Sequence, residues 1–276
     1  MDTKLKIYYS RKPGSEGMID LHTHLLPDWD DGPESWDEVS RMVEVAAADG
    51  ETAVCLTPHI FRFSRYQDNQ QILEERFQQF YERFGADNRI SFFRGAEVFI
   101  HPDMVQEIES RHLSVNQSEY VFVEFPSDQV PAGARELFYR LMLAGYTPII
   151  SHPERNEFFG RQPEILYDFI NRGCLAQLTA GSLVGSFGRE VQRRAELFLK
   201  HHLVQIMASD AHDYRKRPPV LSRGVEAAAR LVGSELAEAM VRQVPEAILN
   251  NQIIPELERP TSPLRRGFFF RWFKKK

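Results

Sequence analysis

The chain has 276 residues, of which 42% are hydrophobic and 26% are charged, and its formal net charge is -5. This composition is ordinary for one large, soluble globular domain that can bury a core. No apolar run approaches the ~20 residues that a membrane span requires, and the N-terminus lacks the continuous apolar segment of a secretory signal. We therefore expect a cytoplasmic protein.

The two cysteines, Cys55 and Cys174, both lie inside apolar, strand-like runs. They do not indicate a disulfide framework, and they suit a reducing compartment. Neither begins a Cys-x5-Arg phosphate-binding loop, because Phe61 and Ala180 stand where the arginine would be. Phosphatase chemistry based on a cysteine nucleophile is therefore unsupported.

Residues 1–17 are polar and show no periodicity that would bury them, so we interpret them as an N-terminal extension. The stretch Met18–Gly32 follows, and its short apolar run leads to His22 and His24. Side chains two residues apart in a strand point to the same side, so this pair directs two imidazole nitrogens at one point. The pattern is the outline of a metal site.

Helical and extended patterns alternate along the rest of the chain. A capping box at Ser35–Glu38 begins a helix that Gly50 ends, and apolar residues from Ile72 to Phe84 repeat at helical spacing. Further predicted strands cover residues 52–57, 90–97, 120–124, 148–151, 175–179 and 204–209, and further helices cover residues 135–144, 163–172 and 189–201. This alternation predicts an α/β fold with a parallel sheet.

Polar side chains recur at the C-terminal ends of the predicted strands. Seven β/α units with this feature favour a distorted (β/α)7 TIM-like barrel. A doubly wound open sheet is the alternative, but it would place the chemistry at one switch point rather than on several strands. The side chains in question are His22, His24, Asp31, His59, Glu97, Glu124, His152, Asp210 and His212.

Nine imidazole and carboxylate groups at one mouth of a barrel would repel and desolvate one another unless cations bound there. Their mixed nitrogen and oxygen atoms suit manganese, iron or zinc, and the sequence does not choose among these metals. Clustered divalent ions lower the pKa of bound water and hold phosphate oxygens, which predicts a phosphomonoester hydrolase.

Two arginines follow predicted ligands closely enough to grip a phosphoryl group. Arg155 lies three residues beyond His152, and Arg217 lies in the loop after His212. An aryl phosphate also requires an aromatic rim, for which Phe61, Phe63 and Tyr66 are the candidates.

Several short motifs resemble the metal-binding motifs of the PHP (polymerase and histidinol phosphatase) superfamily. These are His22-x-His24, Thr57-Pro-His59, Gly95-Ala-Glu97, Ser151-His-Pro-Glu-Arg155 and Ser209-Asp-Ala-His212. Other motifs narrow the resemblance to the capsular and exopolysaccharide tyrosine-protein phosphatases of that superfamily, namely Ile19-Asp-Leu-His-Thr-His24, Asp30-Asp-Gly-Pro33, Glu124-Phe125 and Arg217-Pro-Pro219. The resemblance runs from Met18 to about Asn250.

This resemblance implies a trinuclear site, which in this family is most often a manganese site. It assigns His22, His24, Glu97 and Asp210 to one metal, Asp31, His59 and His212 to a second, and Glu97, Glu124 and His152 to a third. It also makes Arg155 and Arg217 the phosphate-clamping arginines. The implied substrate is the phosphotyrosine tail of a membrane-anchored bacterial autokinase that controls polysaccharide synthesis, and no nucleic-acid partner is expected.

The residues alone say only that the substrate is a phosphomonoester, so three other functions stay open. One is a small-metabolite phosphatase of the histidinol-phosphate type, and another is a phosphodiesterase. The third is a non-catalytic metal-binding regulatory module, against which the complete ligand set argues.

The C-terminal part differs from the predicted phosphatase domain, which covers residues 18–254. A linker and tail occupy residues 255–276, and the segment 264–276 holds six of the 34 Lys and Arg but none of the 39 Asp and Glu. Its Phe and Trp side chains can enter a headgroup boundary while its cations contact anionic lipid. One hypothesis is therefore attachment to the inner face of the plasma membrane. The alternatives are that the aromatic side chains pack on the barrel, that the basic run contacts the acidic body of the protein, or that the segment is disordered.

Overall fold

A computed structural model describes residues 17–263, so residues 1–16 and the predicted membrane-binding segment 264–276 lie outside the described residues. Its strands are all short, and they are β1 (Met18–Thr23), β2 (Glu51–Leu56), β3 (His59–Ile60), β4 (Ser91–Arg94), β5 (Glu97–Phe99), β6 (Tyr120–Glu124), β7 (Thr147–Ser151), β8 (Leu175–Thr179) and β9 (Ile206–Ala208).

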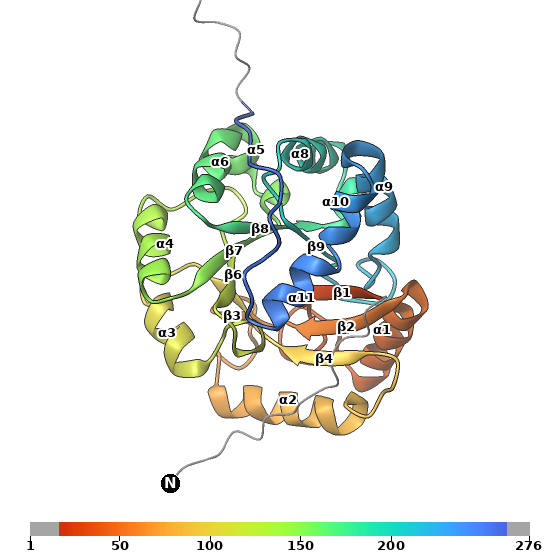
Figure 1. The fold of residues 1–276 in the computed structure, drawn as a ribbon. Coiled ribbons are helices and arrows are strands. Elements are labelled where there is room, and N and C mark those ends of the chain that lie inside the picture. Colours follow the sequence, from red (N-terminus) through yellow and green to blue (C-terminus); the bar gives the residue numbers. More distant parts are fainter. Residues whose placement is uncertain (1–16, 264–276) are drawn as a thin grey trace, which may run out of the picture.

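Helices connect successive strands and surround them (Figure 1). They are α1 (Trp36–Asp49), α2 (Gln70–Phe84), α3 (Met104–Arg111), α4 (Ala134–Leu143), α5 (Glu157–Arg161), α6 (Pro163–Asn171), α7 (Ala180–Leu183), α8 (Arg189–Lys200), α9 (Ser222–Val232), α10 (Ser234–Ala239) and α11 (Gln243–Leu249). Two 3-10 turns cover Val115–Gln117 and Pro153–Arg155. None of the helices within residues 17–263 combines the length and apolar character that crossing a membrane requires.

All strand pairs are parallel, and they form the sheets β1-β2-β4 and β3-β5-β6-β7-β8-β9. Strand β3 continues the path of β2, and β5 continues the path of β4. The nine strands therefore occupy seven positions around the barrel, and these follow one another in chain order. A parallel bridge between Thr23 and Ala211 joins the two ends of this series. The predicted distorted (β/α)7 barrel is therefore confirmed.

The seam between β1 and β9 is the source of the distortion. At the upper end His24 N–H donates to Ala211 O over 2.9 Å. Lower down, Ile19 N–H donates to Val241 O over 2.7 Å, and Met207 N–H donates to Met240 O over 3.0 Å. Residues 240–241, between α10 and α11, thus lie between the two strands.

The prediction of one continuous strand over residues 90–97 is wrong. The strand is interrupted at Gly95, which separates β4 from β5. The neighbouring path also breaks, since Pro58 follows β2 and has no N–H to donate. A Cβ on Gly95 would lie 3.1 Å from Cys55 Sγ, so only a glycine passes this point without displacing its neighbour. As a result His59 and Glu97 begin short strands instead of following long ones, and they pair directly in the register of β3 and β5.

The helix signals in the sequence are confirmed more closely. Ser35 accepts a hydrogen bond from Glu38 N–H at the start of α1, and Gly50 ends that helix at φ 92°. The remaining predicted helices agree with α2, α4, α6 and α8 to within one residue at most ends. The alternation of patterns did not predict α3, α5, α7, α9, α10 and α11, which belong to the loops and the C-terminal region.

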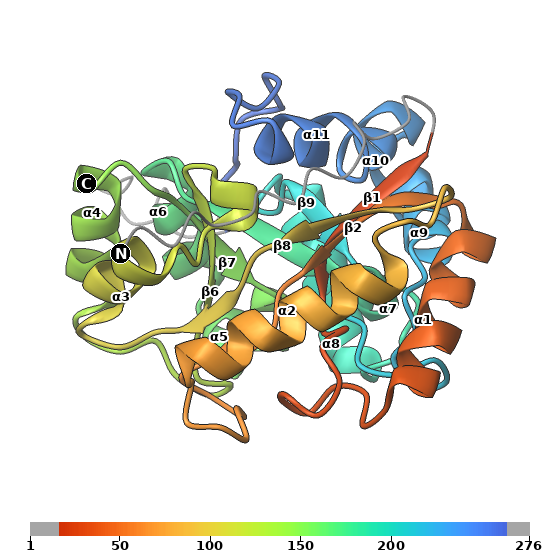
Figure 2. The same ribbon diagram turned by 90° about the horizontal axis from the view of Figure 1, so that it is seen from below.

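The barrel has one apolar layer outside its strands and another inside. The inner layer includes Leu21, Cys55, Phe122 and Ile206, and it packs against Ile248 of α11. Helix α11 therefore closes the N-terminal end of the barrel (Figure 1), and Figure 2 shows it on the opposite side from the loops that follow β1 and precede α2.

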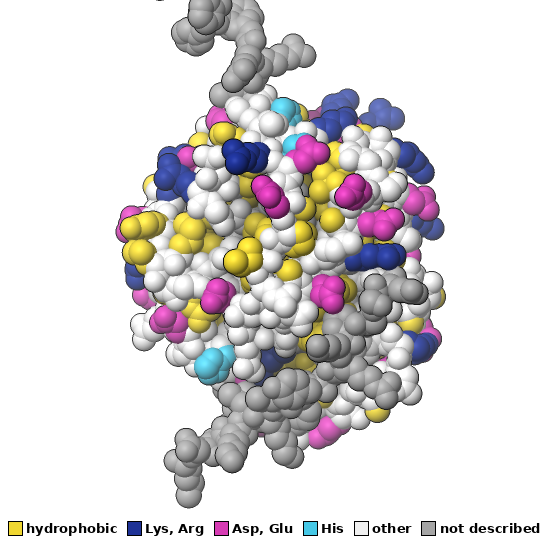
Figure 3. Space-filling model, viewed as in Figure 1, with side chains coloured by type: hydrophobic (Ala, Val, Ile, Leu, Met, Phe, Trp, Pro, Cys, Tyr) yellow, Lys and Arg dark blue, Asp and Glu magenta, His cyan; other side chains and the backbone are white. Residues whose placement is uncertain are grey.

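The segment after α11 continues across this closed end, where Ile254 and Leu257 pack on the inner layer. Tyr120 Oη donates to Gln252 O over 2.9 Å, and Thr261 N–H donates to His201 O over 2.9 Å. The space-filling view of this face shows hydrophobic side chains across its middle, with acidic side chains around them (Figure 3). Up to Pro263, the predicted linker therefore packs on the barrel.

A buried carboxyl group lies near the same end of the barrel. Glu51, the first residue of β2, is only 2% exposed, and neither of its carboxylate oxygens has a hydrogen-bond partner within residues 17–263. Burial, together with the charges of Asp20 and Asp49, raises the pKa of this carboxyl well above its ordinary value.

We predict that Glu51→Gln stabilises the protein at neutral and higher pH. Folding raises the pKa of the carboxyl, so its contribution is fully present below the ordinary value of 4.5 and is lost as the pH rises through the folded value. The free energy of unfolding of the variant relative to the parent should rise by on the order of 1–3 kcal/mol between about pH 4 and pH 8. Denaturant titrations measure it, with the exposed Glu82→Gln as control, and a pH-independent difference would contradict the prediction.

Candidate metal centre

The nine predicted ligands all lie at the C-terminal end of the barrel, where the loops converge. Eight are buried, and Asp31 is the exposed member. They come from six of the seven strand positions: His22 on β1, His24 and Asp31 after it, His59 on β3, Glu97 on β5, Glu124 at the end of β6, His152 after β7, and Asp210 and His212 after β9.

The first group consists of His22, His24 and Asp210, whose ligand atoms lie within 4.8 Å of one another. The Nε2 atoms of the two imidazoles are 3.3 Å apart. Asp210 Oδ1 lies 3.4 Å from His24 Nε2 and 3.7 Å from His22 Nε2. Glu97 Oε2 is 3.3 Å from His22 Nε2, so all four ligands assigned by resemblance to one metal meet here.

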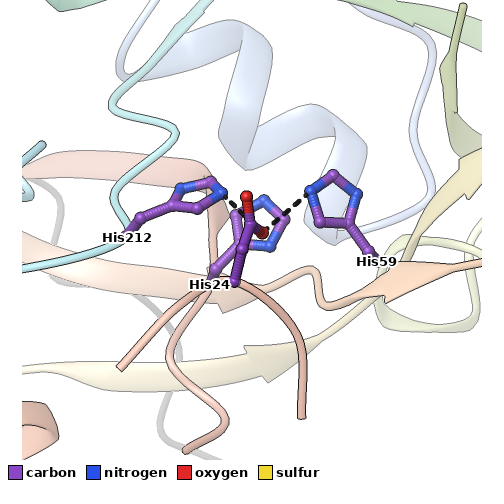
Figure 4. A group of neighbouring side chains, drawn as sticks. His24, His59 and His212 are labelled. Atoms are coloured by element: carbon purple, nitrogen blue, oxygen red, sulfur yellow. Dashed lines mark ion pairs between the residues drawn. The ribbon is translucent and has the colours of Figure 1, made fainter. Parts of the chain in front are cut away.

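The second group consists of His24, Asp31, His59 and His212. Asp31 Oδ1 lies 3.4 Å from His59 Nε2 and 3.3 Å from His212 Nε2, and the dashed lines in Figure 4 mark these two ion pairs. The three histidines face one another in that view, because β1, β3 and the loop after β9 end side by side.

The third group consists of His59, Glu97 and Glu124. His59 Nδ1 lies 3.0 Å from Glu97 Oε2 and 3.7 Å from Glu124 Oε2, so this imidazole has one nitrogen in each of two groups. His152 Nε2 is 2.9 Å from the other oxygen of Glu97. Glu97 is therefore shared between neighbouring groups, as the resemblance implies.

Four buried ligand atoms have no hydrogen-bond partner within residues 17–263, and all four face this space: His59 Nδ1, Glu97 Oε2, Glu124 Oε2 and Asp210 Oδ1. Buried polar atoms are almost always paired, and an unpaired atom costs on the order of 1–3 kcal/mol. A set of converging imidazole and carboxylate atoms without partners is the arrangement that divalent ions satisfy. The residues present therefore fit a metal centre.

The carboxyl groups in the centre differ in how readily they are charged. Burial disfavours the charge on Glu97, yet three nearby imidazoles hold the pKa of this carboxyl well below its ordinary value. These imidazoles belong to His22, His59 and His152. In contrast, burial and the charge of Glu97 raise the pKa of Glu124 to about 8.

Two residues that sequence reasoning missed orient the imidazoles from behind. Asp30 Oδ2 lies 2.9 Å from His24 Nδ1, which leaves His24 Nε2 free to bind a metal. Gln177 Oε1 lies 3.0 Å from His22 Nδ1 and has the same effect. Asp30 belongs to one of the motifs quoted above. Gln177 lies in the mostly apolar strand β8, where its amide side chain is the only sequence signal of its role.

Two ligands adopt a strained backbone. His152 has φ 31° and directly follows β7, and Asp210 has φ 53° and is the second residue after β9. Residues other than glycine rarely adopt positive φ, and such strain gathers at functional sites. Here the left-handed turn redirects the side chain as the chain leaves the strand.

The two predicted arginines reach the same carboxylate. Burial disfavours the charge on Asp210, but these arginines hold the pKa of that carboxyl well below its ordinary value. Arg155 lies 2.6 Å from Asp210 Oδ2, and Arg217 lies 2.7 Å from the same oxygen. A third arginine, Arg62, lies 2.7 Å from Glu124 Oε1, and sequence reasoning missed it within an aromatic and basic loop.

The structure places only one of the three proposed rim aromatics beside the centre. Phe63 is 49% exposed, and its ring centroid is 5.0 Å from that of His59. Phe61 instead packs on His101 at 4.1 Å, and Tyr66 donates a hydrogen bond to Asp28. The aromatic contact that geometry supports is therefore Phe63 alone.

Both cysteines are buried and unpaired. Burial raises the pKa of the Cys55 thiol and raises that of Cys174 to about 12, so neither forms a thiolate readily. Neither belongs to the groups of potential metal ligands.

A barrel with a cluster of imidazoles and carboxylates at its C-terminal mouth defines a class of metal-dependent hydrolases. The sequence model of the family "Capsular polysaccharide synthesis, CpsB/CapC" matches residues 18–250. The chain therefore belongs to the CpsB/CapC family.

Individual relatives agree with this assignment. The tyrosine-protein phosphatase YwqE of Bacillus subtilis is 33% identical over 258 residues, which cover 93% of this chain and 100% of that protein. The putative tyrosine-protein phosphatase CapC of Staphylococcus aureus is 32% identical over 208 residues, which cover 75% and 81%. The tyrosine-protein phosphatase CpsB of Streptococcus pneumoniae is 26% identical over 245 residues, which cover 86% and 100%.

Solved structures have the same fold. A chain from the crystal structures of YwqE and CpsB, described as metal-dependent tyrosine phosphatases, matches with a TM-score of 0.82 at 32% identity, covering 89% of this chain and 100% of that one. A histidinol phosphate phosphatase of Lactococcus lactis matches with a TM-score of 0.50 at 14% identity, covering 78% and 94%. The second match concerns the fold alone.

We predict that Asp30→Asn weakens metal binding about 10- to 100-fold, because the amide removes the charge that orients and polarises His24. Titration of the metal-free protein with Mn2+ by calorimetry measures the affinity. The exposed Asp37→Asn in α1 is the matched control and should bind as the parent does. Equal affinity of Asp30→Asn and the parent would contradict the role assigned to Asp30.

Proposed function

We propose that the chain is a metal-dependent protein-tyrosine phosphatase, a phosphoric monoester hydrolase. The observation that carries the proposal is the convergence of nine imidazole and carboxylate ligands, four with unpartnered atoms, next to two arginines. Membership of a family whose relatives are named tyrosine-protein phosphatases supports the same reaction.

We further propose that the centre holds three divalent ions, with Mn2+ as the expected metal and Fe or Zn as alternatives. Bound divalent ions supply hydroxide near neutral pH and polarise phosphate oxygens. The chain's own ligands fix where this chemistry occurs. Glu97 joins neighbouring groups, and Asp30 and Gln177 set which nitrogen of His24 and His22 faces the centre.

Arg155 and Arg217 would bind the phosphoryl oxygens that the centre leaves free. Both guanidinium groups already lie at Asp210, and Arg217 Nε has no hydrogen-bond partner among the described residues. Charge-assisted hydrogen bonds from such donors strengthen as negative charge develops in the transition state. Phe63, exposed beside His59, would pack on the aryl ring of phosphotyrosine.

A panel of substrates separates this function from its alternatives. The protein, freed of metal by a chelator and then given Mn2+, should hydrolyse a phosphotyrosine peptide and a small aryl phosphate. Histidinol phosphate and an aryl phosphodiester should react at least about 10-fold more slowly, because the first carries its phosphate on an alkyl oxygen and the second is not a monoester. Faster turnover of histidinol phosphate would assign the chain to small-metabolite hydrolysis, and absence of all turnover would favour a binding module.

We predict that Arg155→Ala and Arg217→Ala keep their metal but lose transition-state stabilisation, on the order of 10- to 1000-fold in kcat. Elemental analysis measures the metal, and hydrolysis of the aryl phosphate measures the rate. Arg161→Ala, on the exposed face of α5, is the control. Parent rates in both variants would remove the phosphate-binding role of these arginines.

The protein partner we propose is the phosphotyrosine tail of a membrane-anchored bacterial kinase in capsule or exopolysaccharide synthesis, and the family's role in capsular polysaccharide synthesis supports it. We also propose a cytoplasmic location at the inner face of the plasma membrane. The basic, aromatic composition of residues 264–276 supports this location.

A further inference from the structure

A second hollow lies beside the metal centre, with a volume of about 510 Å³. Its walls come from α1, from α7 and the residues that follow it as far as Phe187, from the start of α9 and from the loop between β9 and α9. None of the nine metal ligands lines it. We call it the cationic cavity, because Arg215, Lys216, Arg217 and Arg223 are part of its wall.

Among the described residues, three of these four cations form no direct ion pair, although the charge of Lys216 acts on the nearby Asp213 and helps to lower the pKa of that carboxyl. Arg215, Lys216 and Arg223 form no ion pair within 4.0 Å among residues 17–263. Asp49 is the acidic residue in the wall, and its carboxylate already accepts hydrogen bonds from Leu221 N–H, Ser222 N–H and Ser222 Oγ at the start of α9. The cavity therefore offers unpaired cations to a ligand.

Hydrogen bonds to Asp213 hold the backbone that carries three of these cations, Arg215, Lys216 and Arg217. Asp213 Oδ1 accepts hydrogen bonds from Arg215 N–H and Lys216 N–H, both over 2.6 Å, and Asp213 Oδ2 accepts one from Arg217 N–H over 3.3 Å. The guanidinium group of Arg215 also lies over the ring of Tyr214 at 4.8 Å. Such a rigid turn reduces the entropy that a bound ligand must remove.

The cavity and the metal centre share a wall. Arg217 lines the cavity, and its guanidinium group contacts the metal ligand Asp210. Phe187 also lines the cavity, with its ring 5.0 Å from the guanidinium carbon of Arg155 and 5.9 Å from that of Arg217. One arginine side chain therefore separates the two sites.

We propose that the cationic cavity is a substrate subsite that binds an acidic group, a carboxylate or a second phosphate, close to the phosphotyrosine in the same peptide. This inference rests on the proposed function and adds a preference for acidic substrates. An extended peptide advances by about 3.3–3.6 Å per residue, so the acidic group lies within about three residues of the phosphotyrosine. The unpaired cations select against basic residues at that position.

The test compares four kinds of substrate at low and high salt. They are a neutral phosphotyrosine peptide, a set of peptides that each carry one Glu within three residues of the phosphotyrosine, a peptide with a second phosphotyrosine, and a small aryl phosphate. The variant is Lys216→Ala with Arg223→Ala. The matched control is Arg230→Ala, which lies on α9 outside the cavity and pairs with Glu226.

The parent should prefer acidic peptides over the neutral one by about 3- to 10-fold in kcat/KM, mostly through KM, and salt should reduce the preference. The double variant should lose the preference yet hydrolyse the small aryl phosphate at the parent rate, and Arg230→Ala should keep both. The Glu and second-phosphotyrosine peptides show which acidic group the cavity takes.

An equal response of the parent and the double variant to acidic peptides would overturn the subsite. Absence of turnover with every substrate, the aryl phosphate included, would instead remove the proposed function. In that event, binding of each acidic peptide to the parent and to the double variant still decides the subsite, because weaker binding by the variant supports it and equal binding overturns it. Arg223→Glu, which should favour a Lys-containing peptide, gives a second variant with reversed charge.

Discussion

The burial of charge at the mouth of the barrel is the constraint on which the rest of the structure depends. Glu97 has no exposed surface, and its two oxygens lie among the imidazoles of His22, His59 and His152. Groups like these weaken a fold unless a ligand or a second layer of hydrogen bonds satisfies them. Asp30 supplies part of that layer, and bound cations would supply the rest, so metal binding and stability are linked.

The apolar interior explains how the protein tolerates such a centre. Beneath the ligands the barrel is filled by side chains such as Leu21 and Phe122, and α11 seals its far end. This packed base fixes the strands, so the ligands at their ends are held by the scaffold rather than by one another. Because the apolar base is separate from the polar end of the barrel, substitutions among the metal-binding residues can leave the packing of the core unchanged.

Much of the architecture follows from local sequence signals, and most of what was missed depends on long-range contacts. The strand ends, the Ser35 cap and the ligand residues are visible as patterns within a few positions. The breaks at Pro58 and Gly95 come from two adjacent strands adjusting together, which no single segment reveals. In the sequence, Gln177 looks like part of an ordinary core strand. Its role appears only when the fold brings it next to His22. The cationic cavity is likewise assembled from four separate elements.

The seam between β1 and β9 sets the order in which the molecule can be completed during synthesis. The lower half of β1 donates to Val241, so the first strand of the barrel gains this partner only when the chain has been made almost to α11. Contacts that join distant parts of a chain form late and slowly. Until then β1 presents an unpaired edge, of the kind that other chains can pair with. Of the described strands, β1 thus keeps part of one edge unpaired until residues 240–241 have been made, and the same strand carries His22 of the metal centre.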